Sequence, residues 1–375
     1  ATTPVDPRVL EAMLPFYRED FGNPASHSHV YGWRAEAAVE DARERIAAAL
    51  GALTKEIVFT SGATESNNLA LLGSARAGRA RGDHLVSVVT EHPAVLDPLR
   101  QLEREGFRTT LLPVDSDGLV DPDAVAAAIT ERTLLVSVMA ANNEIGVLQP
   151  LAEIGHTCAE RGVPLHCDAA QAVGKIPIQV DELGVTLLSI SGHKLYGPMG
   201  VGALYIRSRR PRVRLEPILY GGGHERGLRS GTLAVPLIVG LAAAIDLCLE
   251  EMEPESKRLL ELRARLWQRI SGQLDGVRQN GHSERRLPGN LNLSFEGVNA
   301  DRLLLSLKDL ALSTGSACSS AAPGPSHVLE ALGLSPALAR ASLRLGLGRG
   351  TTVQEIDRAA DAIIAAVRAE RRVSS

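Results

Sequence analysis

The chain has 375 residues, of which 45% are hydrophobic and 22% are charged. This composition is that of a globular protein with two or more domains, and it excludes a disordered or fibrous chain. Its 40 basic and 44 acidic residues leave a net charge of -4, so no overall electric field attracts nucleic acid or an anionic membrane. We therefore expect neither of them as a partner.

The longest nearly apolar run, residues 233–249, is interrupted by Pro236 and Asp246 and indicates a buried helix. A membrane helix needs ~18 to 20 uninterrupted apolar residues. The chain opens with Ala-Thr-Thr-Pro, without a charged and apolar leader, so we expect a cytoplasmic protein. The cysteines at 158, 167, 248 and 318 form neither CxxC pairs nor a dense framework, which argues against metal sites and structural disulfides.

Helical and strand patterns alternate between residues 34 and 206, which predicts an α/β fold with helices covering a mainly parallel sheet. The first helix is predicted over Arg34–Leu50, where apolar residues recur on one face. Asp121 and Pro122 predict the start of a helix through Ile129, because aspartate caps helices and proline fits their first position. Seven short apolar runs predict strands: residues 56–60, 84–89, 109–113, 133–139, 163–167, 186–190 and 201–206.

After Gly231 the pattern changes to two long helices, predicted over residues 236–252 and 254–274. A strand over residues 290–295 and an amphipathic helix over residues 353–371 follow. We therefore expect a large domain over residues 16–250 and a smaller α+β domain over residues 251–375, with residues 1–15 packing against the smaller one. Residues 313–326 are almost all small residues and proline, which predicts a mobile loop in the smaller domain.

Lys194 is one of only five lysines, and it lies in SGHKLYGP just after the strand predicted over residues 186–190. Open α/β sheets bind ligands at the carboxyl ends of their strands, so Lys194 is a candidate Schiff-base lysine, although a solvated loop lysine is an equal interpretation. Asp168 follows another predicted strand and either faces the same crevice or caps a helix. Pyridoxal phosphate needs both groups: an amine for the imine and a carboxylate for its pyridine nitrogen.

Three further segments contain residues that could bind a cofactor or take part in catalysis. Residues 60–67 (TSGATESN) follow a strand, and their amides and hydroxyls could converge on a phosphate or simply cap a helix. His92, in TEHP after another strand, could stack on a ring or move a proton, though a lone histidine is more often structural. Cys318 lies in the small-residue loop, where it is either a reactive thiol or a small residue filling a turn.

Ordered motifs across nearly the whole chain resemble the class V, fold-type I pyridoxal-phosphate enzymes, and specifically the cysteine desulfurases of the NifS and IscS type. The resemblance implies a large domain with a mainly parallel seven-stranded sheet, a smaller α+β domain, pyridoxal 5'-phosphate as cofactor, and a homodimer. The motifs are ATTPVDP at 1–7, FGNPAS at 21–26, FTSGATESNN at 59–68, TEHPAVL at 90–96, NNEIGVLQP at 142–150, HCDAAQAVGK at 166–175, SGHKLYGP at 191–198, GGGHERGLRSGT at 221–232, STGSACSS at 313–320 and LRLGLGRGTT at 343–352.

The resemblance also implies a role for each matching residue. Lys194 is the Schiff-base lysine, Asp168 the partner of the pyridine nitrogen, and His92 the catalytic residue stacked on the ring. Cys318 accepts the sulfur. Gln171 and Asn143 address the ring hydroxyl, Ala63, Thr64, Ser191 and His193 hold the phosphate, Thr232 reaches the phosphate of the neighbouring subunit, and Arg344 with Asn143 binds the substrate carboxylate.

The activity implied is conversion of L-cysteine to L-alanine, with the sulfur held as a persulfide on Cys318. The persulfide would pass to an acceptor protein, such as a scaffold for iron-sulfur cluster assembly. Rival interpretations are a selenocysteine lyase or an aminotransferase of the same fold, and a catalytically silent scaffold. Cys318 argues against transamination, and a binding module would need neither Lys194 nor Arg344.

Overall fold

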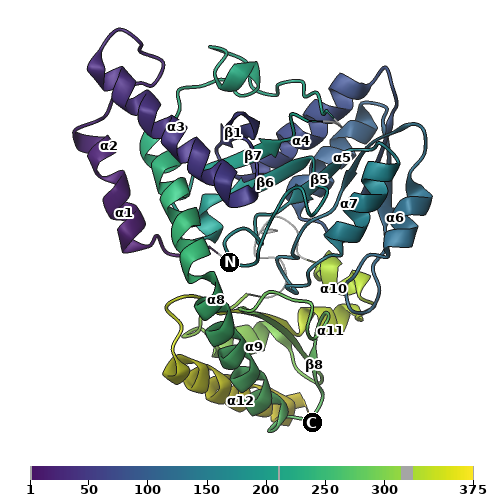
Figure 1. Ribbon diagram of the computed structural model, residues 1–375. Helices are drawn as coiled ribbons and strands as arrows, with labels where there is room; N and C mark the ends of the chain where they lie inside the picture. Colours follow the sequence, from purple (N-terminus) through teal and green to yellow (C-terminus); the bar gives the residue numbers. More distant parts are fainter. Residues whose placement is uncertain (1, 210–211, 314–323, 375) are drawn as a thin grey trace. The chain divides into compact units, whose positions relative to one another are not determined.

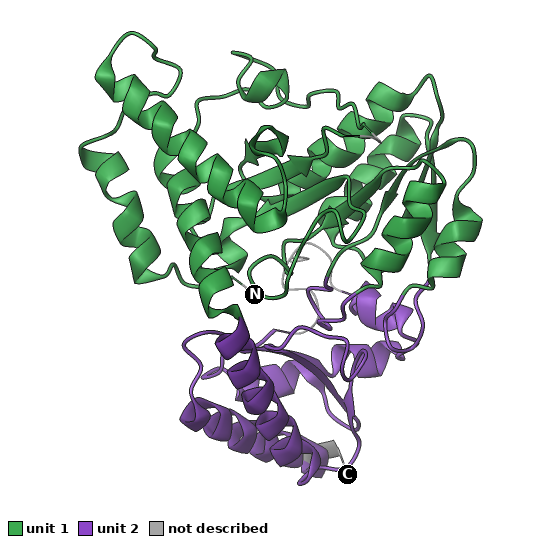
Figure 2. Ribbon diagram, viewed as in Figure 1, with its two compact units in different colours: residues 1–112, 120–140, 149–252 green, residues 113–119, 141–148, 253–375 purple. Residues whose placement is uncertain are grey.

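The computed structural model describes residues 2–209, 212–313 and 324–374 (Figure 1). It divides into two compact units (Figure 2). Unit 1 holds the chain up to residue 112 together with residues 120–140 and 149–252, and unit 2 holds residues 113–119, 141–148 and the chain from residue 253. Most of the loop predicted over residues 313–326, Cys318 included, lies outside the described residues.

Unit 1 is built on a seven-stranded sheet with the order β1-β7-β6-β5-β4-β2-β3. β7 runs antiparallel to β1 and β6, and the other neighbours pair in parallel, which confirms the predicted α/β class. Most strands are buried along their whole length, as expected for a sheet covered on both faces. The strands are β1 (Ile57–Thr60), β2 (His84–Val88), β3 (Arg108–Leu112), β4 (Thr133–Ser137), β5 (Leu165–Asp168), β6 (Leu187–Ser191) and β7 (Gly202–Ile206).

Helices connect these strands, and α4 packs its apolar side on β4, β6 and β7. α3 begins before the predicted Arg34, because the Nδ1 atom of His29 accepts a hydrogen bond from the Gly32 amide and caps the helix. The helices are α1 (Pro7–Met13), α2 (Pro15–Arg18), α3 (Val30–Leu50), α4 (Ala63–Gly78), α5 (Pro93–Arg104), α6 (Pro122–Ala128) and α7 (Leu151–Glu160), with 3-10 turns η1 (Thr54–Glu56), η2 (Gly192–Lys194) and η3 (Glu225–Gly227).

The N-terminal segment differs from expectation, because it belongs to unit 1 and not to the unit that holds the C-terminal residues. The amide of Thr3 donates to the carbonyl of His193 over 3.0 Å, and the amide of Asp6 donates to the carbonyl of Tyr196 over 2.9 Å. An extended segment needs partners for its main-chain groups, and the loop after β6 supplies them. The segment thus packs beside Lys194.

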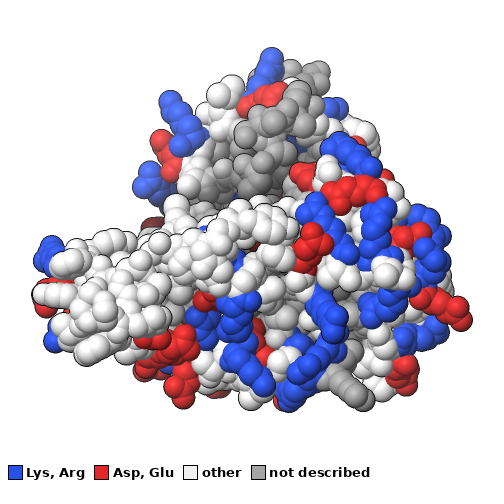
Figure 3. Space-filling model, turned by 90° about the horizontal axis from the view of Figure 1, so that it is seen from above, with Lys and Arg blue, Asp and Glu red and all other residues white. Residues whose placement is uncertain are grey.

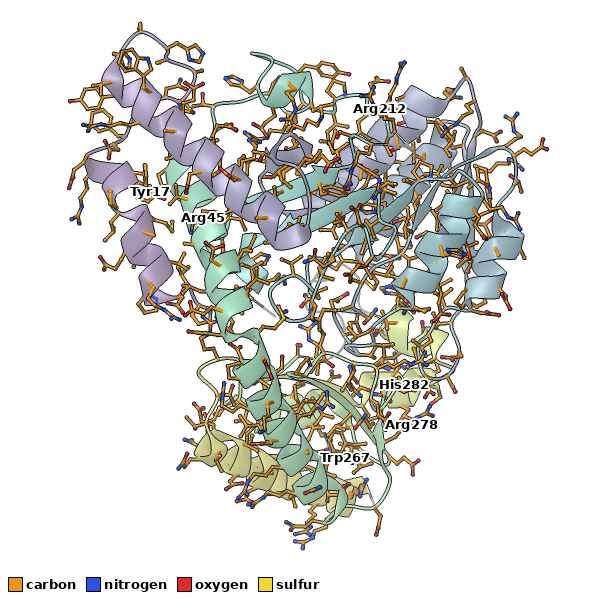
Figure 4. All side chains as sticks on the ribbon, in the orientation of Figure 1. Tyr17, Arg45, Arg212, Trp267, Arg278 and His282 are labelled. Carbon is orange, nitrogen blue, oxygen red and sulfur yellow. The ribbon has the colours of Figure 1, made fainter. Side chains whose placement is uncertain are left out.

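Helix α8 (Val235–Ser271) is continuous where two helices were predicted. Pro254 lies inside it, and proline removes one main-chain donor without ending the helix. Buried apolar residues continue on both sides of it, which favours one long helix over a break. α3 is tied to α8 by Arg45, whose Nε atom donates to the Asp246 carboxylate over 2.7 Å (Figure 4).

Unit 2 contains an antiparallel sheet in the order β10-β9-β8. β9 (Asn290–Phe295) matches the predicted strand, whereas β8 (Val277–Gln279) and β10 (Ser342–Gly346) are too short and mixed to stand out. The core joins Leu293 and Phe295 of β9 to Leu266 of α8, and Trp267 packs partly buried against it (Figure 4). The remaining helices are α9 (Ala300–Ser306), α10 (His327–Ala331), α11 (Pro336–Arg340) and α12 (Val353–Ser374).

A buried ion pair joins α3 to the loop at η3. The guanidinium of Arg43 donates two hydrogen bonds of 2.8 Å to the carboxylate of Glu225, and both side chains are at most 5% exposed. The same carboxylate accepts the Phe59 amide of β1 over 2.7 Å. The pair therefore fixes residues 221–232 against the edge of the sheet.

We expect Glu225→Gln to lower the free energy of unfolding by about 3 kcal/mol, because it removes the buried counterion of Arg43 and leaves only the exposed Glu40. The matched control is Asp97→Asn, which removes the exposed pair with Arg100, both 63% exposed. This control should cost less than about 1 kcal/mol. Urea unfolding at pH 7 measures both changes, and equal losses in the two variants would contradict the buried role of Arg43.

Candidate cofactor and substrate site

The ends of four strands of unit 1 lie at one edge of the sheet. Asp168 at the end of β5 is in register with Ser189 of β6, and Ser191 at the end of β6 is in register with Gly202 of β7. Gly202 in turn pairs with Thr60 at the end of β1. The sheet thereby brings Asp168, Ser191 and the start of α4 to the edge where α/β folds bind ligands.

Lys194 lies in the turn η2, directly after β6, and is half-buried rather than exposed. The amides of Leu195 and Gly197 both donate to the carbonyl of Gly192 and close the turn, over 3.2 and 3.0 Å. Gly192 has no room for a side chain, since a Cβ atom there would lie 2.7 Å from the carbonyl oxygen of Pro198. The glycine of the SGHK motif therefore serves the tight turn that carries Lys194.

Asp168 is 7% exposed, and both its carboxylate oxygens have partners. Oδ2 accepts from the Nδ2 atom of Asn67 on α4 over 2.7 Å, and Oδ1 accepts from the Ala170 amide over 2.9 Å. The second bond caps a turn, as one of the two sequence interpretations of Asp168 predicted. Sequence reasoning quoted Asn67 only as part of a motif and missed this contact, because it joins residues 101 positions apart.

A second carboxyl group lies under this site. Glu91 is completely buried, and its Oε1 atom accepts the Met139 amide over 2.6 Å. Burial, reinforced by the negative charge of Asp168, raises the pKa of Glu91 well above its usual value. The raised pKa favours the neutral acid, which reduces the negative charge beside Asp168.

The N-terminus of α4 forms an anion-binding corner. No side chain in the described part of the chain caps its first turn, where Gly62 has a φ of 146° that only glycine adopts easily. Ser191 Oγ lies 3.8 Å from the position of a Cβ atom on Gly62, so the hydroxyl borders the helix terminus. Ala63 and Thr64 are the first residues of the helix, and amides there attract phosphate.

His193 and Gln171 lie in the loops that follow β6 and β5. Burial, helped by the positive charges of Lys194 and Lys175, lowers the pKa of His193, so its imidazole is neutral at pH 7. Gln171 is buried, and its Oε1 atom accepts from the Lys175 ammonium over 3.0 Å. Lys175 is a second positive group that the sequence did not single out as functional.

His92 has a defined tautomer. It caps α5, and its Nδ1 atom accepts the Ala94 amide over 3.1 Å. A nitrogen that accepts a hydrogen bond carries no proton, so the proton of the neutral ring is on Nε2. His92 thus has a structural role as the N-cap of α5, and its hydrogen bond to the Ala94 amide also fixes the orientation of the ring.

Unit 2 brings the two predicted substrate-binding residues together. Arg344 on β10 donates from its guanidinium to the carbonyl of Asn143 over 3.1 Å. Its amide donates to the carbonyl of Ser313 over 2.8 Å. Beside Asn143, the buried carboxyl of Glu144 accepts the hydroxyl of Ser326 over 2.5 Å. Glu144 and Ser326 were missed, because nothing in their local sequence indicates a pair 182 residues apart.

Thr232 is exposed and follows η3. Its loop is held by the pair between Arg43 and Glu225 and by Arg229, whose Nε atom donates to Glu65 over 2.8 Å. Thr232 is therefore carried on an anchored loop, and no contact in the described part of unit 1 joins it to the other predicted phosphate ligands.

The cysteines that the structure describes, Cys158, Cys167 and Cys248, are buried free thiols. Burial raises the pKa of Cys158 to about 12 and that of Cys167 well above its usual value. Cys318 lies outside the described residues. Within the described ranges, no three His, Cys, Asp or Glu side chains are grouped to hold a metal ion, and no helix is long and apolar enough to cross a membrane.

The polar groups at this edge of the unit 1 sheet match the chemical groups of pyridoxal phosphate. The cofactor carries an aldehyde, a pyridine nitrogen and a phosphate, and here an amine, a buried carboxylate and an uncapped helix N-terminus occur at one sheet edge. Asp168 keeps its orientation through Asn67, and Gly62 leaves the α4 amides uncovered.

Comparison with known proteins gives the family that the sequence motifs resemble. The aminotransferase class-V model matches residues 1–359. The chain is 53% identical over 374 residues to the cysteine desulfurase IscS of Rickettsia felis, covering 100% of this chain and 91% of that one. It is 55% identical to the cysteine desulfurase of Mus musculus, with 100% and 81% covered.

Among solved structures, a NifS-like protein superposes with a TM-score of 0.91 at 38% identity, covering 98% of this chain and 97% of that chain. The fold, the polar groups at the sheet edge and the sequence identity over the whole chain all indicate the same family. The chain therefore belongs to the class-V aminotransferase family, in the branch that holds the NifS- and IscS-type cysteine desulfurases.

Proposed function

We propose that the protein is a pyridoxal-phosphate-dependent cysteine desulfurase, which converts L-cysteine to L-alanine and holds the sulfur on Cys318. The observation that carries this proposal is the placement of Lys194 and Asp168 at the ends of paired strands, beside the uncapped N-terminus of α4. Identity above 50% to curated cysteine desulfurases over the full chain supports it.

The residues at the sheet edge would each hold one part of the cofactor. When bound, pyridoxal phosphate supplies an electron sink that stabilises negative charge on the α-carbon of an amino acid joined to it. Lys194 would attach the cofactor, Asp168 would keep the pyridine nitrogen protonated, and His92 would cover the ring. Ala63, Thr64, Ser191 and His193 would hold the phosphate, and Gln171 with Asn143 would address the ring hydroxyl.

The protein's own groups would move the protons of the reaction. The Lys194 amine would take a proton from the α-carbon of the substrate and return it, since a neutral amine is a base. His92 carries its proton on Nε2, so that atom can donate towards the site while Nδ1 remains bonded to Ala94. Asn67 keeps Asp168 from turning away during these steps.

Arg344 would bind the substrate carboxylate through its planar guanidinium, with Asn143 beside it. The Cys318 thiolate would then attack the sulfur of the substrate. An S–S bond forms while the Cβ–Sγ bond of the substrate breaks, so L-cysteine and the Cys318 thiol become L-alanine and a Cys318 persulfide. The step requires a thiolate, because the protonated thiol is a poor nucleophile.

We also propose a homodimer in which Thr232 reaches the phosphate of the partner subunit. Aromatic side chains exposed around α2 and the start of α3 support a partner surface, since exposed aromatic clusters mark protein interfaces. They are Tyr17, Phe21, Tyr31 and Trp33, each at least 46% exposed.

The sulfur acceptor would be a protein, such as an iron-sulfur scaffold, and the setting cytoplasmic. On the face shown in Figure 3, Lys and Arg lie among Asp and Glu rather than in one continuous basic patch. A mixed surface of this kind does not favour the phosphate backbone of a nucleic acid. A protein acceptor is the better match.

The decisive experiment measures alanine and sulfide from L-cysteine with excess dithiothreitol, which reduces the persulfide. We expect equal amounts of both products from the wild type, and a loss of at least about 100-fold in Lys194→Ala and Cys318→Ala. The cofactor colour should survive in Cys318→Ala, because Lys194 is unchanged. Undiminished sulfide from Cys318→Ala would remove the persulfide, and a keto acid in place of alanine would favour an aminotransferase.

Thiol reactivity gives an independent test of Cys318. At pH 8 the buried thiols of Cys158 and Cys167 are protonated, because burial raises the pKa of both. We expect an aromatic disulfide reagent to find one fast thiol per native chain, absent from Cys318→Ala, with the others reacting only in urea. A fast thiol that persists in Cys318→Ala would show that another cysteine is accessible.

Substitution of Arg344 tests substrate binding. Arg344→Lys keeps the charge but loses the planar pair of donors, so the KM for L-cysteine should rise about tenfold with a smaller change in kcat. Arg340→Lys, on the exposed end of α11, is the matched control and should leave KM unchanged. An unchanged KM in Arg344→Lys would assign the carboxylate to another group.

A further inference from the structure

Thr3 contacts the main chain on both sides of Lys194. Its amide donates to the carbonyl of His193 over 3.0 Å, and its hydroxyl donates to the same carbonyl over 3.2 Å. The hydroxyl oxygen also accepts the amide of Tyr196 over 2.8 Å. One threonine side chain thus bridges the residue before Lys194 and the second residue after it.

The loop needs such a bridge. Tyr196 has a φ of 63°, a left-handed conformation that costs a bulky residue roughly 1 kcal/mol or more. The turn is closed internally by the Gly192 carbonyl, which takes the amides of Leu195 and Gly197 but not that of Tyr196. Tyr196 is 9% exposed, so its amide needs a protein acceptor, which Thr3 supplies.

The N-terminal segment that carries Thr3 is itself anchored. The Asp6 amide donates to the Tyr196 carbonyl over 2.9 Å, and the Asp6 carboxylate caps α1. Arg8 pairs with that carboxylate over 2.8 Å and with Glu251 of α8 over 2.7 Å. Thr3 is therefore held against the Lys194 loop by a fixed segment.

We propose that Thr3 is a positioning residue, which sets the direction of the Lys194 amine by bonding the main chain on both sides of it. The proposal rests on the proposed role of Lys194 and adds a residue that touches neither substrate nor cofactor. A simple anchoring role for the N-terminus would need the Thr3 amide alone. The hydroxyl contributes the bond that holds Tyr196 in its strained conformation.

The test compares Thr3→Val, which removes the hydroxyl and keeps the shape, with Thr3→Ser, which keeps the hydroxyl. Hydrogen exchange in the apoprotein reports the Tyr196 amide directly, in peptides covering residues 192–198. We expect exchange there to become about tenfold faster in Thr3→Val and to return towards wild type in Thr3→Ser. Thr2→Val is the matched control for the exchange measurement, because the Thr2 hydroxyl lies 3.1 Å from the His193 side chain, whereas the Tyr196 amide bonds Thr3.

Two functional measurements complete the test. In Thr3→Val, pyridoxal phosphate should attach to the apoprotein about tenfold more slowly, and kcat should fall by a similar factor while KM for L-cysteine stays within about twofold. Thr3→Ser should restore both. Thr3→Ala replaces Thr3→Val if the latter does not fold.

Unchanged exchange in Thr3→Val, or faster exchange with unchanged attachment, would overturn the positioning role. These outcomes are separate from a failure of the desulfurase proposal, since exchange and attachment require no sulfur chemistry. An equal loss in Thr3→Ser and Thr3→Val would also contradict the proposal, because the hydroxyl would then be irrelevant.

Discussion

The close approach of two glycines determines the rest of the candidate site. A Cβ atom on Gly202 would lie 2.6 Å from the Cα atom of Gly62 and 2.3 Å from the Ile190 carbonyl oxygen, so this contact permits no side chain. It sets the start of α4 against the ends of β6 and β7. The helix N-terminus, Ser191 and the turn that carries Lys194 are neighbours for that reason.

Both burial, which shifts pKa values, and ion pairing determine the charge at this edge of the sheet. Burial raises the pKa of Glu91 and lowers that of His193, which favours the neutral form of both. Glu65, in the first turn of α4, is paired with Arg229. The shift of Glu91 matters because a charged Glu91 would repel the negative charge of Asp168. Asn67, which cannot titrate, orients Asp168 without changing this balance.

Short sequence patterns predicted the features that depend on interactions between residues close in sequence. The short apolar strands follow from hydrophobic patterning, and so does the position of Lys194 directly after one of them, and the structure has both. The continuity of α8 through Pro254 was not predictable, because packing on both sides outweighs one missing donor. The contacts of Asn67, Thr3 and Glu144 join residues more than 100 positions apart, and no spacing rule reports such pairs.

Burial also explains why one cysteine can be reactive among several. A thiol is a nucleophile only as its anion, and an apolar interior disfavours the anion, so Cys158 and Cys167 are held protonated by the same core that stabilises unit 1. A sulfur carrier must avoid that core. The small residues around Cys318 in the sequence offer little apolar surface to bury. The residues at the two ends of this segment, Ser313 and Ser326, are hydrogen-bonded to Arg344 and Glu144.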